Sequence, residues 1–167
     1  MGIIQKKICM LGTFAVGKTS LVAQFVHGIF SEKYKTTIGV KIDKKSLELD
    51  GQPIELLLWD LTGDDRFQKV STSYLRGSNG YLLVADGTRK PTLDVALTLH
   101  KHAQATLGEV PFVLLLNKAD LVDEWELEDE DWTHLQALGW TILQTSAKTG
   151  TRVDEAFRIL AQQLVPS

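Results

Sequence analysis

Short apolar runs alternate along this chain with longer stretches whose apolar residues recur at helical spacing. Most of the runs are continuously apolar, which is typical of strands in a parallel sheet that helices cover on both faces. The pattern therefore predicts an α/β fold. It places strands at residues 3–11, 80–86, 111–117 and 140–145, and helices at residues 18–27, 71–75, 92–107, 125–137 and 151–165.

Two further strands, at residues 40–49 and 53–60, are separated by Asp50-Gly51. This dipeptide is a hairpin turn signal, so we expect the two strands to run antiparallel. The second strand ends in the apolar stretch L-L-L-W followed by Asp60. The sheet is therefore expected to be mostly parallel, with one antiparallel strand.

Length and composition fit one globular domain over residues 1–167, since the chain is 44% hydrophobic. A net charge of -3 argues against a protein that grips nucleic acid through its general charge. Cys9, the single cysteine, lies in the first apolar run and is expected to be buried. Six acidic residues within 124–131 indicate either a solvated helix start or a partner site.

Membrane attachment is not expected from this chain. Its apolar runs, such as residues 113–116, are far shorter than the roughly 20 residues that span a bilayer. The N-terminus does not resemble a secretory signal, and Lys6 stands where a myristoylation motif after Gly2 requires Ser or Thr. The last residues contain no prenylation cysteine. We therefore expect a cytoplasmic protein with no membrane anchor, unless a C-terminal tail was removed.

Residues 12–19, G-T-F-A-V-G-K-T, match the phosphate-binding pattern G-x-x-x-x-G-K-[ST] and directly follow the first predicted strand. Glycines at both ends allow the backbone N–H groups to face phosphate oxygens, and the following helix presents its positive N-terminus to the same anion. Lys18 is expected to reach the β- and γ-phosphates, and Thr19 to ligate Mg²⁺. The alternative is a chance glycine-rich turn.

Two polar loops and one aspartate are expected beside this loop. Residues 28–39 lack periodicity, which predicts a long functional loop over the phosphates. Asp60, at the tip of an apolar strand, is placed to hold the water shell of Mg²⁺. Another glycine-containing polar loop follows at residues 61–67.

Two later motifs, N-K-A-D at residues 117–120 and T-S-A-K at residues 145–148, follow predicted strands. Ligands bind at this edge of open α/β sheets. The Asp120 carboxylate can accept hydrogen bonds from both N1–H and the exocyclic amine of guanine, a donor pair that adenine lacks. An ATP-dependent phosphate-loop enzyme is therefore disfavoured. An isolated N-K-x-D occurs by chance, but all these motifs in this order are specific.

The chain resembles a Ras-superfamily small GTPase over almost its whole length and is most similar to the Rab branch. The residues that carry the likeness are T-I-G-V at 37–40, W-D at 59–60, R-F at 66–67 and Y-L-R-G at 74–77. The resemblance implies a six-stranded, mostly parallel sheet with one antiparallel strand and five helices. It also implies binding of GTP or GDP with Mg²⁺.

The resemblance further implies roles for single residues. Thr37 ligates Mg²⁺ and senses the γ-phosphate, which the Gly63 N–H also contacts, and Tyr34 covers the phosphates. Phe30 lies against guanine. Residues 28–40 and 61–75 are then the switches that release on loss of the γ-phosphate. The implied metal set is Thr19, Thr37 and, through water, Asp60.

On the base side, the resemblance implies that Lys118 packs along the guanine plane and that the Ala147 N–H donates to its O6 atom. The full expected nucleotide-binding set comprises Ala15, Val16, Gly17, Lys18, Thr19, Ser20, Phe30, Tyr34, Thr37, Gly63, Asn117, Lys118, Asp120, Ser146, Ala147 and Lys148.

Ile42, Trp59 and Tyr74 correspond to an apolar triad through which Rab proteins meet effectors, although the first position there is usually aromatic. The alternative makes them ordinary residues half-buried by the switches. The implied partners are guanine nucleotide and effector, exchange-factor or activator proteins.

Three residues depart from the family pattern. Phe14 stands where small residues are usual, near the path of an incoming catalytic arginine. Asp64 replaces the glutamine that orients the attacking water, and it is too short and negatively charged for that task. Thr62 stands where alanine is common, where it either caps the loop or accepts the γ-phosphoryl group.

The catalytic set is therefore expected to be Lys18, Asp64 and Thr37, and the function that of a Rab-like switch that hydrolyses GTP slowly. The alternative is a binding module locked to its nucleotide without turnover.

Overall fold

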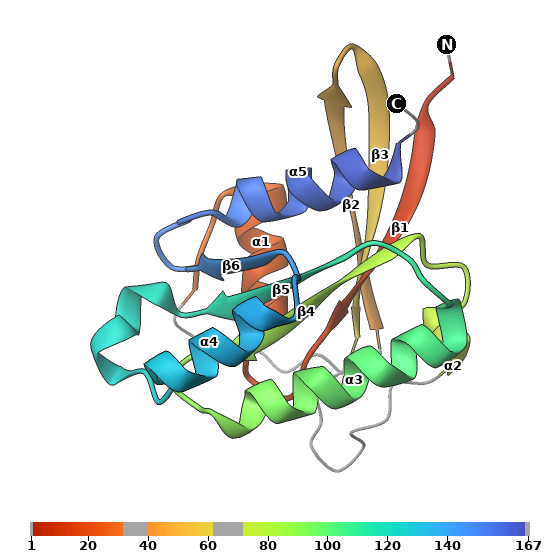
Figure 1. Cartoon of the computed structure of the whole chain (residues 1–167). Helices are drawn as coiled ribbons and strands as arrows, with labels where there is room; N and C mark the ends of the chain where they lie inside the picture. The colour runs from red at the N-terminus through yellow and green to blue at the C-terminus, as the bar shows by residue number, and fades with distance from the viewer. Residues whose placement is uncertain (1, 32–39, 62–71, 166–167) are drawn as a thin grey trace.

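The computed structural model describes residues 2–31, 40–61 and 72–165. Within these ranges, one six-stranded sheet has the order β2-β3-β1-β4-β5-β6. Five α-helices and one 3₁₀ helix, η2, join the strands (Figure 1). The elements in chain order are β1 (Ile4–Leu11), α1 (Lys18–His27), β2 (Val40–Leu49), β3 (Gln52–Leu61), α2 (Thr72–Leu75), β4 (Gly80–Asp86), α3 (Pro91–Leu107), β5 (Phe112–Asn117), η2 (Ala119–Glu124), α4 (Asp129–Ala137), β6 (Ile142–Thr145) and α5 (Val153–Leu164).

The predicted sheet is confirmed. β1 pairs in parallel with β3 and β4, β4 with β5, and β5 with β6, whereas β2 and β3 are antiparallel. The hairpin turn has the expected chemistry, because Asp50 and Gly51 adopt φ angles of 50° and 80°. Tight hairpins with two such residues match the natural twist of the strands. β1 thus lies in the middle of the sheet, and the phosphate-binding loop follows its end.

Helices cover both faces of the sheet (Figure 1). Successive side chains of β1 point to opposite faces: Ile8 and Met10 belong to the core under α1 and α5, and Cys9 and Leu11 to the core under α3. Cys9 is buried, as predicted. Burial on both faces explains why the central strands are continuously apolar.

The predicted helix at 125–137 is wrong at its start. The helix begins at Asp129, and Trp125 before it is extended, with φ −69° and ψ 138°. Glu128 and Asp131 form a reciprocal capping box at the new start. The acidic residues 128–131 therefore do mark a helix start, whereas Glu124 ends the preceding 3₁₀ helix. The other boundaries agree within two residues. No helix in the described ranges is long and apolar enough to cross a membrane.

Candidate nucleotide-binding site

The loop at residues 12–17 is held in shape by close approaches that only glycine permits at its two ends. A Cβ on Gly12 would lie 2.5 Å from the Val84 carbonyl oxygen, and one on Gly17 would lie 2.3 Å from Asn117 Nδ2. Gly17 also has a φ of 105°, which disfavours any other residue. The loop therefore folds tightly over the ends of β4 and β5.

Lys18 begins α1 and folds back across this loop. Its Nζ atom donates to the carbonyl oxygens of Gly12, at 2.7 Å, and of Thr13, at 3.1 Å. Only 6% of the residue is exposed. A lysine fixed in this way places a positive charge beside the helix N-terminus, and this arrangement favours an anion there.

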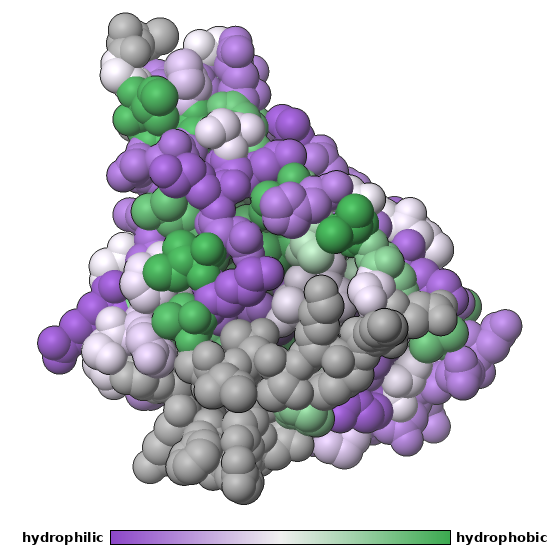
Figure 2. Space-filling model, turned by 180° about the vertical axis from the view of Figure 1, so that it is seen from behind, coloured by the Kyte–Doolittle hydropathy of each residue, from purple (hydrophilic) through white to green (hydrophobic). Residues whose placement is uncertain are grey.

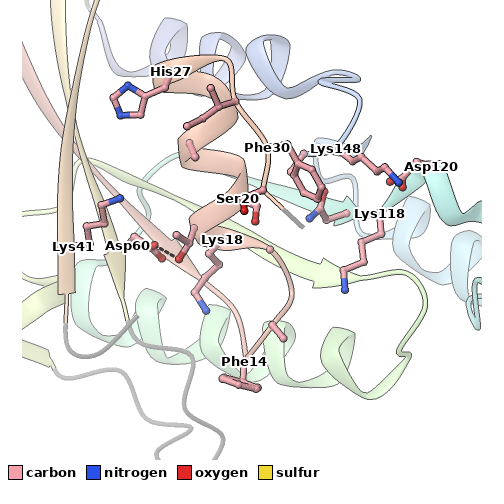
Figure 3. Close-up of a pocket in the computed structure, with 18 of the residues that line it drawn as sticks. Phe14, Lys18, Ser20, His27, Phe30, Lys41, Asp60, Lys118, Asp120 and Lys148 are labelled. Carbon is pink, nitrogen blue, oxygen red and sulfur yellow. Dashed lines mark hydrogen bonds between the residues drawn. The ribbon is translucent and has the colours of Figure 1, made fainter. Parts of the chain in front are cut away.

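Asp60, whose side chain lies near Lys18 in Figure 3, contacts Thr19. The Thr19 hydroxyl donates to Asp60 Oδ2 at 2.5 Å, and Asp60 is buried at the end of β3. A hydroxyl and a carboxylate are hard oxygen donors of the kind that Mg²⁺ prefers, with phosphate oxygens and water completing its shell. The donor set therefore fits Mg²⁺. The described residues contain no cluster of three His, Cys, Asp or Glu side chains that would suit a fully protein-held metal.

A cavity of about 470 Å³ runs from this pair to the loops after β5 and β6 (Figure 3). This volume lies within the usual range for small-molecule sites. Its lining includes most of the predicted binding residues in the described ranges, namely Ala15, Gly17, Lys18, Thr19, Ser20, Phe30, Asn117, Lys118, Asp120, Ala147 and Lys148. Residues predicted from separate motifs thus share one cavity.

Asn117 joins the 12–17 loop at one side of this cavity to the sheet. Its Nδ2 donates to the carbonyl oxygen of Val16 at 2.9 Å, and its Oδ1 accepts from the Thr145 hydroxyl at 3.1 Å. Asn117 and Thr145 are both buried. One side chain therefore fixes the position of the phosphate-binding loop relative to β5 and β6.

Asp120 is oriented by the second motif. The Ser146 hydroxyl donates to Asp120 Oδ1 at 2.7 Å, and Gln24 Nε2 of α1 donates to the Ala147 carbonyl oxygen at 2.8 Å. Asp120 remains exposed at the cavity rim. Its carboxylate is thus held in place by Ser146 where it lines the cavity. Sequence reasoning missed Gln24, since its contact lies in no motif.

Asp86, at the end of β4, was also missed. Its buried carboxylate accepts from Lys118 Nζ at 2.8 Å, Arg89 Nε at 3.0 Å and the Thr88 hydroxyl at 2.6 Å. Burial alone would raise the pKa of Asp86, but these hydrogen bonds outweigh it and lower the pKa. Arg89 Nη2 also donates to the Phe14 carbonyl oxygen at 2.8 Å. The sequence signal for Asp86 was a carboxylate at the end of an apolar run. In the structure, Asp86 pairs in register with Asn117.

Comparison with known proteins agrees with this geometry. The sequence model of the Ras family matches residues 7–166. The chain belongs to the Ras family. It is 36% identical to GTP-binding protein ypt2 of Schizosaccharomyces pombe over 160 residues, which cover 95% of this chain and 80% of that protein. It is 34% identical to Ras-related protein Rab-8B of Pongo abelii, over 95% and 78%, and 33% identical to Ras-related protein Rab-19 of Rattus norvegicus, over 95% and 75%.

The expected fold and class are thereby confirmed. The chain is a Rab-like GTP-binding switch of the Ras family and a GTPase. Several residues that the family resemblance implicated lie outside the described residues, so their roles stay predictions. They are Tyr34, Thr37, Thr62, Gly63 and Asp64.

Phe14, the departure in the Ras family loop, lies within the described part. Figure 3 shows its ring at the tip of the loop, away from Asp120 and Lys148. Phe14 also lines the cavity. The benzyl group therefore stands at the end of the cavity formed by the 12–17 loop, and its effect on an incoming arginine stays a prediction.

The three predicted effector residues, Ile42, Trp59 and Tyr74, lie close together. Ile42 and Trp59 are partners across β2 and β3, and Ile42 is 50% exposed. Lys7 Nζ lies 3.7 Å from the centroid of the Trp59 ring and donates to the Tyr74 carbonyl oxygen at 2.6 Å. Figure 2 shows one face of the molecule, on which apolar side chains form separate patches among polar ones. The effector role stays a prediction, as does its alternative.

Proposed function

We propose that this GTPase holds GTP or GDP in the cavity of Figure 3, with the phosphates at Lys18 and the base at Asp120. The observation that supports this most is the single cavity shared by the phosphate-binding loop, Asn117 and Asp120. Lys18 is fixed by two carbonyl oxygens at one end, and Asp120 by Ser146 at the other. Residues 1–167 then form one nucleotide-binding domain.

The Thr19–Asp60 pair would hold Mg²⁺ in this proposal, Thr19 directly and Asp60 through water, with Thr37 from the first switch. The bound ion would supply positive charge that neutralises the β- and γ-phosphates. Lys18 would add a second positive charge to neutralise the phosphates. These residues bind and orient the substrate, and they stabilise the charge that develops on the γ-phosphoryl oxygens.

Hydrolysis is proposed to be slow because Asp64 stands at the water-orienting position. A carboxylate repels the γ-phosphate and cannot donate the hydrogen bond of an amide. Phe14 would also obstruct an arginine supplied by an activator, which is a contribution of about 10³ to 10⁵ in rate. Lys18, Thr19 and Asp60 are all present for binding, and nothing in the described residues favours a module locked to its nucleotide.

Single-turnover hydrolysis of bound GTP tests this part of the proposal. Asp64→Gln should raise the rate constant by about 10- to 100-fold, since a positioned catalytic group contributes about 10² or more. Asp65→Gln is the matched control, because it makes the same change one residue along the same loop. Fast hydrolysis by the unchanged protein, or equal effects of the two substitutions, would remove Asp64 from the mechanism. Slow turnover also predicts that GTP co-purifies with the protein.

Thr62 is proposed to cap its loop and to remain unmodified. Intact-mass measurement after incubation with GTP should show no added phosphate. A mass increase of one phosphoryl group that is absent from Thr62→Ala would contradict this assignment.

The kinds of partner proposed for this chain follow from its family. Rab-like GTPases bind guanine nucleotide, regulators and effectors. For this chain, the surface of Ile42, Trp59 and Tyr74 is the proposed effector contact, since Lys7 contacts both the Trp59 ring and the Tyr74 carbonyl oxygen.

A further inference from the structure

Trp125 lies between η2 and α4, in the segment that follows the N-K-A-D motif. Its indole Nε1 donates to the carbonyl oxygen of Lys118 at 2.9 Å. The face of the indole lies directly on Gly87, so that a Cβ added to Gly87 would be only 2.2 Å from Trp125 Cε2. The indole therefore fills the space that any side chain at position 87 would occupy, and it contacts the backbone of the N-K-A-D motif from outside the cavity.

Lys118 is a residue whose backbone needs such a contact. Its φ of 73° lies in the left-handed region, which residues with a Cβ adopt rarely. The side chain is held by Asp86, as described above, and the carbonyl group by Trp125. These two contacts hold both ends of Lys118, two residues before Asp120.

Gly87 connects the same segments through its backbone. Its N–H donates to the Asn117 carbonyl oxygen at 3.1 Å, and its carbonyl oxygen accepts from the Glu126 N–H at 2.9 Å. Gly87 thus lies between the strand that precedes Asp120 and the segment that carries Trp125. A displacement of Trp125 from Gly87 would loosen the loop that carries Asp120.

We propose that Trp125, seated on Gly87, is a positioning residue for guanine recognition: it holds the 117–120 loop so that Asp120 meets the base. This rests on the proposed function, in which Asp120 accepts from the exocyclic amine of guanine. Ordinary core packing would affect protein stability and all nucleotides alike. A positioning role instead affects selectivity for the amine.

The test compares GDP with IDP, whose hypoxanthine base lacks the exocyclic amine, by competition against a fluorescent guanine nucleotide. Trp125→Phe keeps an aromatic ring but loses the indole N–H. Loss of one hydrogen bond corresponds to about a three- to tenfold effect. GDP binding should weaken by this factor, and the preference for GDP over IDP should fall with it. Trp132→Phe is the matched control, because Trp132 is half-buried against the same core; its preference should not change.

Gly87→Ala provides an independent variant that leaves Trp125 in the sequence. The added methyl group should push the indole off its seat and reproduce the effect of Trp125→Phe. In a Trp125→Ala background the space is empty, so Gly87→Ala should add less than about twofold. Equal effects of Gly87→Ala in both backgrounds would overturn the proposal.

Asp120→Asn distinguishes a failure of the Trp125 role from a failure of the proposed function. If Asp120→Asn lowers the preference for GDP over IDP but Trp125→Phe and Gly87→Ala do not, the role of Trp125 is wrong and the proposed function stands. Equal losses of GDP and IDP binding in the Trp125 variant would also overturn its role. If Asp120→Asn leaves the preference unchanged, the reading of guanine by Asp120 fails, and the role of Trp125 fails with it.

Discussion

Replacing Asp86 by Asn removes one negative charge from the end of β4 while keeping the shape of the side chain. The carboxylate is fully buried and pairs with Lys118 and Arg89, and it also accepts from the Thr88 N–H at 2.8 Å. The amide group of Asn carries two donors of its own, so part of it would face the donors that Asp86 now accepts from. Asp86 links Lys118 of the 117–120 loop to Arg89, which donates to the Phe14 carbonyl oxygen, and the substitution breaks this link.

The expected magnitude follows from the exposure of the partners. Breaking a fully buried ion pair costs about 3–5 kcal/mol. The Lys118 and Arg89 side chains are 33% and 40% exposed, so water takes over part of their solvation. We therefore expect Asp86→Asn to lower the free energy of unfolding by about 2 kcal/mol, near the value of one hydrogen bond to a charged group.

Urea unfolding at saturating GDP measures this difference, and the GDP dissociation rate shows how much of it reaches the site. Asp154→Asn is the control: Asp154 pairs with Arg158 at 2.6 Å, but the two side chains are 66% and 41% exposed. Exposed pairs contribute little, so this variant should lose less than about 0.5 kcal/mol. Equal losses of unfolding free energy in the two variants would contradict a special role of the buried Asp86 carboxylate.

The pH dependence of Asp86 has a definite sign. The folded pKa is lowered from 3.8, so its stabilising contribution is present above that value and is lost as the pH falls through the folded pKa. The difference between the wild type and Asp86→Asn should therefore be constant between about pH 5 and pH 8. A difference that shrinks within this range would contradict the assignment.

Three other substitutions test separate parts of the structure. Asn117→Ala removes two buried hydrogen bonds and should speed GDP dissociation by at least about tenfold in a nucleotide-exchange assay; an unchanged rate would contradict the role of Asn117 in fixing the loop. Gly12→Ala should destabilise the protein by about 1–3 kcal/mol in thermal or urea unfolding, because the new Cβ has no space beside the Val84 carbonyl oxygen; a neutral effect would mean that the loop can move. Burial lowers the pKa of His100 from 6.5, so the unfolded chain takes up the proton first and stability falls below about pH 6.5. Urea unfolding of His100→Gln should show a weaker loss than the wild type, and parallel pH profiles would exclude His100 as the cause.

Periodicity and turn chemistry in the sequence were enough to predict the sheet. The strands come from continuous apolar runs, and the antiparallel edge from Asp50-Gly51. The start of α4 was predicted wrongly because Trp125 extends the apolar pattern of that segment, while its actual partners are Gly87 and the Lys118 carbonyl group. Contacts with residues this far along the chain leave no periodic signal.

For the site as well, the sequence predicted some residues and missed others. Lys18, Thr19, Asn117 and Asp120 stand in motifs whose spacing predicts contact with a ligand. Asp86 instead acts on other protein groups, and a single aspartate at a strand end is common. The partner of the Lys118 side chain was therefore not foreseen: the structure pairs it with Asp86, and its packing along the base stays a prediction.

The base preference of Asp120→Asn tests whether guanine nucleotide binds in this cavity with its base at Asp120. Affinities for GDP and for XDP, whose xanthine base carries an oxygen in place of the exocyclic amine, are measured for both proteins. We expect the wild type to prefer GDP and Asp120→Asn to shift the preference toward XDP, since the amide can donate to that oxygen. A variant that still prefers GDP by the wild-type ratio would contradict the claim.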